Sequence, residues 1–121
     1  MEERQIIYIG SSLKDLNKIP QIVQDTFTVG ILQAAQGKKH ISAKPLKGFG
    51  GNSVLELVED HRSGTYRAVY TIQFEKALYV IHVFQKKSKR KIATPKEEID
   101  LIKQRLKRAN TDYKERFGSG D

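Results

Sequence analysis

The residues best suited to chemistry in this sequence are cations placed around one predicted hairpin. Arg67 stands inside a strongly apolar predicted strand, residues 66–74, where a guanidinium is costly unless it reaches a partner or a groove. A second predicted strand, residues 77–84, is followed directly by a run in which five of the six residues 86–91 are Lys or Arg. Cations gathered at one end of a sheet can bind phosphate and can neutralise charge on a phosphoryl oxygen. The sequence therefore predicts a phosphate site built from Lys47, Arg67, Lys86, Lys87, Lys89, Arg90 and Lys91.

Each of these candidates also has a structural interpretation. Arg67 could pair with Glu56 or Glu59 across the sheet. His82, in the middle of the second strand, is a candidate general base, but a histidine there is more often a core residue with a satisfied hydrogen bond. The basic run could be solvated surface, although its position directly after a buried strand favours a functional role.

Other site chemistries have little support in the sequence. The three histidines lack metal-site spacing and there is no cysteine, so neither a metal site nor a cofactor is expected. The glycine-rich GFGG loop is neither a P-loop nor a dinucleotide fingerprint. No nucleophile elbow supports a serine triad.

Length and composition indicate one basic globular domain. The chain has 121 residues, enough for a single core, and residues 1–121 are expected to form one domain. Lys and Arg number 22 against 14 Asp and Glu, a formal net charge of +8, which points to a polyanion or an acidic protein partner. The absence of cysteine, of a signal peptide and of a long apolar run predicts a soluble cytoplasmic protein that does not bind membranes.

The order of the predicted elements is β-α-α-β-β-β-α. They are a strand at 4–9, a helical turn opened by Ser11 or Ser12, a helix from Pro20 to a stop at Gly37, a loop at 38–52, an edge or half-buried strand at 53–59, the hairpin strands at 66–74 and 77–84, a helix capped by Thr94, and a frayed end at 116–121. Both hairpin strands are apolar on both faces, as central strands are. This order predicts an α+β fold, with a small twisted, mainly antiparallel sheet packed against helices.

Residues 44–106 resemble the phage-derived, HigB-like branch of the RelE/ParE toxin superfamily. The LKGFGG loop, the GTYRAVY strand and the HVFQKKS…ATP ending occur together and in order. The resemblance implies the toxin of a type II toxin–antitoxin pair, most often a metal-independent endoribonuclease that cuts mRNA on the ribosome and inhibits translation. In such enzymes the 2′-OH of the RNA attacks the adjacent phosphate. The implied partner is an antitoxin, which can be a helix-turn-helix protein.

The resemblance also assigns roles to single residues. Arg67 matches the strand arginine that holds the scissile phosphate, Lys86 or Lys87 matches a basic pair at the end of the last strand, and Lys47 matches a loop cation. A two-residue turn at Glu75 and Lys76 would put Arg67, His82 and Lys86 on one face, whereas the family alignment favours Lys87.

Two departures from RelE keep alternatives open. Strand 53–59 carries Val, Leu and Glu where RelE has lysines, and no tyrosine follows the basic run, so that no general base is obvious beyond His82. The alternatives are a ParE-like toxin that inhibits a protein target such as gyrase, and an inactive nucleic-acid-binding domain.

Overall fold

The computed structural model describes residues 3–86 and 94–118. In chain order its elements are β1 (Gln5–Tyr8), α1 (Ser12–Leu16), α2 (Gln21–Ala35), β2 (Ala43–Pro45), β3 (Val54–His61), β4 (Gly64–Thr71), β5 (Ala77–Lys86) and α3 (Lys96–Phe117). The predicted order of elements is confirmed, with one addition. The short strand β2 lies inside the segment predicted to be a loop, because three residues between Lys38 and Asn52 pair with β3.

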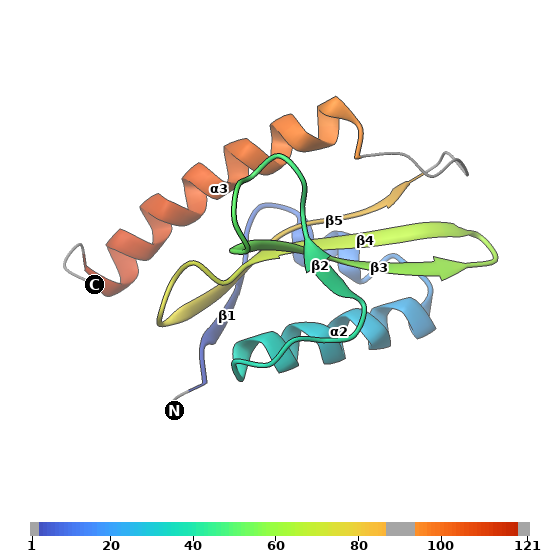
Figure 1. The fold of residues 1–121 in the computed structure, drawn as a ribbon, viewed down its shortest axis with the longest axis horizontal. Helices are drawn as coiled ribbons and strands as arrows, with labels where there is room; N and C mark the ends of the chain where they lie inside the picture. Colours follow the sequence, from blue (N-terminus) through green and yellow to red (C-terminus); the bar gives the residue numbers. More distant parts are fainter. Residues whose placement is uncertain (1–2, 87–93, 119–121) are drawn as a thin grey trace.

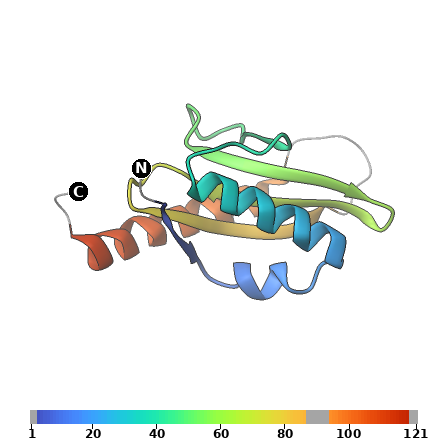
Figure 2. The same ribbon diagram turned by 90° about the horizontal axis from the view of Figure 1, so that it is seen from below.

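The sheet has five strands in the order β1-β5-β4-β3-β2, and only β1 and β5 pair in parallel. Helix α3 lies along one face, and α2 lies along the other (Figure 1). Figure 2, seen from the α2 side, shows α1 beside α2. The predicted α+β fold with a mainly antiparallel sheet is therefore confirmed, and β4 and β5 are central strands as expected. Strand β3 is not an edge strand, since β2 pairs with it on the outer side.

The connection between β4 and β5 is longer than the predicted two-residue turn. The pairing of the two strands far from this connection is nevertheless the one that the two-residue turn predicted. Residues 72–76 join β4 to β5, so that Tyr70 pairs with Val80. A β-bulge between Val69 and Tyr70 then shifts the register by one residue, and beyond it Arg67 pairs with Phe84. Arg67, His82 and Lys86 consequently share one face, because Val69 pairs with His82 and Thr65 with Lys86.

The helix starts differ slightly from the predicted ones. Pro20 and Pro95 are the N-cap residues of α2 and α3 rather than their first helical residues. Thr94 therefore precedes the N-cap of α3 and does not form it, in contrast to the sequence prediction. Its hydroxyl instead lies 3.4 Å from Arg67 Nη1, which connects the start of α3 to β4.

Each face of the sheet has its own core, and we call the two surfaces the α2 face and the α3 face. The α2 face packs Val23, Phe27 and Ile31 of α2 against Leu57 and Tyr70 of the sheet. The α3 face packs sheet residues against the α3 residues Ile102, Ala109 and Tyr113. The chain therefore buries its two strongest apolar strands on both sides, as their sequence required.

Candidate phosphate-binding site

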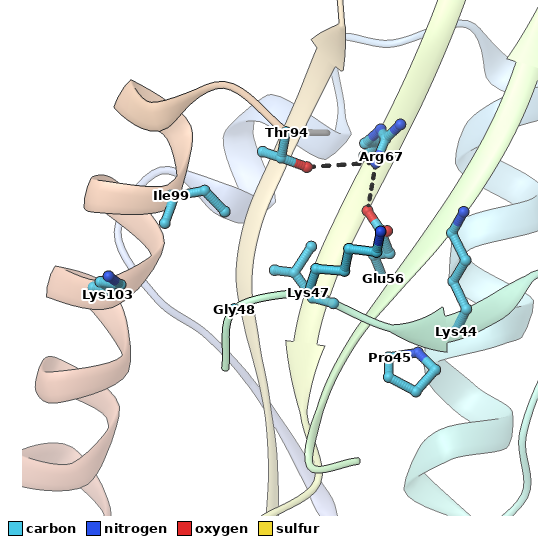
Figure 3. Close-up of a pocket in the computed structure, with 10 residues that line it drawn as sticks. Lys44, Pro45, Lys47, Gly48, Glu56, Arg67, Thr94, Ile99 and Lys103 are labelled. Atoms are coloured by element: carbon cyan, nitrogen blue, oxygen red, sulfur yellow. Dashed lines mark hydrogen bonds and ion pairs between the residues drawn. The ribbon is translucent and has the colours of Figure 1, made fainter. Parts of the chain in front are cut away.

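A cavity of about 510 Å³ opens on the α3 face, between β2, the loop after it and the start of α3 (Figure 3). Its charged lining consists of four cations and one carboxylate: Lys44, Lys47, Arg67, Lys103 and Glu56. Apolar lining comes from Pro45, Leu46 and Ile99. The cavity is therefore cationic with one acidic residue, and such an excess of positive charge is suited to bind a phosphate group.

Arg67 forms an ion pair with Glu56 inside this cavity. Its Nη1 donates to Glu56 Oε1 at 2.8 Å, and the two side chains are only 11% and 6% exposed. The cross-strand pairing considered from the sequence is thus confirmed, and Glu56 is the partner. Glu59 is an odd number of residues away from Glu56 along β3, so the two side chains point to opposite sides of the sheet. Glu59 pairs with Tyr66, which belongs to the core of the α2 face.

The guanidinium of Arg67 has an N–H donor that makes no hydrogen bond with the described residues. Its buried Nε has no hydrogen-bond partner among the described residues, and it is the one buried side-chain polar atom of those residues in this condition. A guanidinium carries five N–H donors, and a buried donor without an acceptor costs about 1–3 kcal/mol. An anion bound at this donor would relieve the cost.

The sequence placed Lys47 correctly near Arg67 but did not identify the other two lysines. Lys44 lies in β2 directly opposite Glu56, and it was missed because β2 was not recognised. Lys103 lies one helical turn after Ile99 on α3, so both side chains lie on the same side of the helix and line the cavity. Its spacing from Ile99 on α3 was the available signal.

His82 lies on the α3 face but does not line this cavity. Its Nε2 is 2.6 Å from Glu98 Oε1, and Nδ1 is 3.3 Å from Arg105 Nη1. An arginine can only donate, so Nδ1 accepts and Nε2 carries the proton towards Glu98. Burial lowers the pKa of His82, against the opposing effect of Glu98. The neutral ring of His82 stacks on the ring of Phe84, with 4.6 Å between the ring centroids, and it lies between β5 and α3.

The basic run is only partly within the described residues. Lys86 is 5% exposed at the end of β5, on the same face as Arg67. Lys87, Lys89, Arg90 and Lys91 lie outside the described residues, and their assignment to the site stays a prediction. Within residues 3–86 and 94–118 there is no cluster of three acidic, His or Cys side chains able to hold a metal ion. No helix in these ranges is long and apolar enough to span a membrane.

Comparisons with known proteins agree with this architecture. A sequence model of the family described as phage derived protein Gp49-like (DUF891) matches residues 14–107. A double arginine-to-alanine mutant of the E. coli toxin RelE in the free state is 18% identical, with a TM-score of 0.56 over 88% of this chain and 98% of that chain.

A second solved structure is the toxin–antitoxin complex RelBE2 from Mycobacterium tuberculosis, at 20% identity and a TM-score of 0.45 over 73% of this chain and 97% of that chain. No curated protein matches the sequence. The expected RelE/ParE-like fold is confirmed by the family match and by the similarity to RelE.

Proposed function

The chain belongs to the phage-derived Gp49-like family, and on this basis we propose that it is the toxin of a type II toxin–antitoxin pair. We further propose that it acts as a metal-independent endoribonuclease in the cytoplasm, where it cuts mRNA on the ribosome and inhibits translation. The observation that carries the proposal is the cationic cavity around Arg67, built on a fold similar to that of the toxin RelE.

The cavity suits the electrostatic demands of RNA cleavage. Attack of a 2′-OH on the adjacent phosphate places extra negative charge on the phosphoryl oxygens, and preorganised cations stabilise that charge. Arg67 would hold the scissile phosphate, while Lys44, Lys47 and Lys103 lie around it on three other segments. Lys86 or Lys87 is the proposed further cation from the end of β5. The RNA affinity should fall steeply with salt, because bound counterions are released from the RNA.

The proposed partner is an antitoxin, as the family resemblance implies, and a helix-turn-helix protein is one form that it can take. A chain with a net charge of +8 and a cationic cavity is suited to an acidic antitoxin segment. The same charge is suited to the RNA of the ribosome.

The test is induced expression of wild type and Arg67→Ala, with growth followed and mRNA ends mapped. We expect growth arrest with new mRNA ends in the wild type, and loss of both in the mutant. Because Arg67→Ala leaves Glu56 buried without its partner, the double variant Arg67→Ala/Glu56→Gln provides a folded companion, verified by circular dichroism. Arg116→Ala, at the far end of α3, removes an equal charge outside the cavity and should behave as wild type.

A ParE-like toxin that binds a protein target such as gyrase is the second candidate. The observation in its favour is Glu56, which neutralises Arg67 and places a negative charge where a phosphate would bind. Growth arrest with intact mRNA would support this candidate. Soluble protein with neither effect would instead indicate an inactive nucleic-acid-binding domain.

A further inference from the structure

We infer that Glu56 is the general base of the proposed RNA cleavage, and that Arg67 holds the Glu56 carboxylate beside the reacting phosphate. The inference rests on the proposed function and names the residue that takes the proton from the 2′-OH. A positioned base of this kind contributes about 10²–10⁴-fold to a rate. The sequence offered only His82 for this role, and the structure offers a better placed group.

The other ionisable groups lining the cavity are unsuited to accept a proton. Lys44, Lys47, Lys103 and Arg67 are donors in their charged forms. Among the described lining residues Glu56 is the one carboxylate. His82 is outside the lining, and each of its ring nitrogens already has a partner on α3. Glu56 is therefore the described group that combines basic chemistry with access to the cavity.

The geometry places Glu56 where the proton would be released. Arg67 Nη1 donates to Glu56 Oε1 at 2.8 Å and to Thr94 Oγ1 at 3.4 Å, whereas Nε has no partner among the described residues and can donate to a phosphate oxygen. The 2′-OH is attached to the carbon next to the one that carries the scissile phosphate. A phosphate bound by Arg67 therefore brings the 2′-OH close to the carboxylate.

The environment of Glu56 keeps the carboxylate in one position. Glu56 stands inside β3 with a side chain 6% exposed, and its backbone belongs to the ladders with both β2 and β4. Lys44 lies directly opposite on β2 and supplies a compensating positive charge on the same face. A base held by a strand and by a hydrogen bond from a guanidinium is preorganised for proton transfer.

The proposed reaction balances without a metal or an oxidant. The 2′ O–H bond breaks, and its proton goes to the Glu56 carboxylate while the 2′ oxygen bonds to phosphorus. The bond between phosphorus and the 5′ oxygen breaks, and the departing oxygen takes a proton from solvent water. Glu56 then returns its proton to the hydroxide so formed. The products are a 2′,3′-cyclic phosphate and a 5′-hydroxyl end.

A general base and a simple counterion of Arg67 predict different behaviour for Glu56→Gln. This variant keeps the shape and a hydrogen-bond acceptor, but it removes the negative charge next to the phosphate. If Glu56 is the base, RNA should bind as tightly as before or more tightly, while the cleavage step is lost. If Glu56 only neutralises Arg67, the variant should bind more tightly and cleave at least as fast.

The experiment measures single-turnover cleavage of an RNA that the wild type cuts, with ribosomes present if they are required. Affinity is measured on the same RNA with a 2′-deoxy nucleotide at the cut site, which cannot react. We expect Glu56→Gln to lose about 10²–10⁴-fold in cleavage rate with no loss of affinity. We also expect it to lose the limb of the pH profile in which the rate rises with pH. Glu56→Asp should recover part of the rate.

The matched control is Glu59→Gln, the same change on the same strand but on the α2 face. It should cleave as wild type does. Cleavage by Glu56→Gln within about threefold of wild type would overturn the inference, as would parallel losses of affinity and rate.

If Glu56→Gln does not fold, Glu56→Asp decides, and an unchanged rate and pH profile in that variant would overturn the inference. An inactive wild type would instead contradict the proposed function itself.

Discussion

The two faces of the sheet are each covered by a helix, but they bury different chemistry. The α2 face is closed by aliphatic and aromatic side chains, and no buried charged residue of the described ranges belongs to its core. The α3 face buries Glu56, His82 and Lys86 together with most of Arg67. Burying a charged side chain costs free energy unless the charge is paired. The α3 face therefore needs polar partners for its buried charges, whereas the α2 face does not.

Several polar groups of the α3 face form a network around Arg105. Arg105 of α3 donates to the Ile81 carbonyl at 3.0 Å and to Ser11 Oγ at 3.1 Å, and it also contacts His82. Glu98 completes this network from the first turn of the same helix. The network holds the first half of α3, and with it the cavity wall formed by Ile99 and Lys103. We conclude that both faces contribute a hydrophobic core, and that the α3 face in addition carries the buried charges and the candidate site.

The two largest expected effects are of similar size and come from one substitution on each face, and the first concerns the α2 face. Phe27 is fully buried there, and Phe27→Ala should lower the free energy of unfolding by about 3–5 kcal/mol through lost transfer energy and the cavity left behind. Urea unfolding followed by circular dichroism measures the change. A loss below about 1 kcal/mol would contradict the close packing of α2 on this face.

The ion pair of the α3 face should respond differently to single and double substitution. Arg67→Met leaves the Glu56 carboxylate buried and unpaired, and should cost about 3–5 kcal/mol. The double variant Arg67→Met/Glu56→Leu removes both charges and should be as stable as wild type or more stable, yet inactive. Urea unfolding and the RNA cleavage assay test both parts. A double variant as unstable as the single one would show that the pair itself stabilises the fold.

Gly30 tests how tightly α2 packs on the sheet. A Cβ at this position would lie 2.8 Å from both terminal methyl groups of Leu57, so Gly30→Ala should cost about 1–3 kcal/mol in overpacking. That cost exceeds or cancels the gain of about 1 kcal/mol from helix propensity. In a Leu57→Ala background the same change should stabilise the protein. The double-mutant cycle therefore predicts a coupling energy, and additive effects would contradict the close contact.

The smallest expected effect is a pH dependence that arises from His82. Because burial lowers the pKa of His82 below 6.5, the folded chain binds fewer protons than the unfolded chain below that pH. The stability from the neutral histidine is present above about pH 6.5 and is lost as pH falls through the folded pKa. Unfolding free energies at about pH 7.5 and 5.5 should therefore differ more in wild type than in His82→Gln. If the unfolding free energy changes equally with pH in wild type and in His82→Gln, the pH dependence arises from groups other than His82.

Much of the fold followed from local patterns. Apolar residues on both faces of β4 and β5 predicted central strands, and Pro20 and Gly37 predicted the limits of the helix that the structure shows as α2. Strand β2 escaped prediction because only three residues pair, and they lie among lysines and glycines. Its pairing depends on the exposed edge of β3, a partner that no local pattern reveals.

The sequence by itself determined the order of the elements, the basic character of the chain, and Arg67 and Lys47 as candidate site residues. Only the tertiary structure decided that Glu56 rather than Glu59 pairs with Arg67, because strand register sets which side chains share a face. It also decided that Lys44 and Lys103 line the cavity and that His82 bonds to Glu98 of α3. These contacts join residues far apart in the chain, and they form only when the helices pack on a sheet whose register is already set.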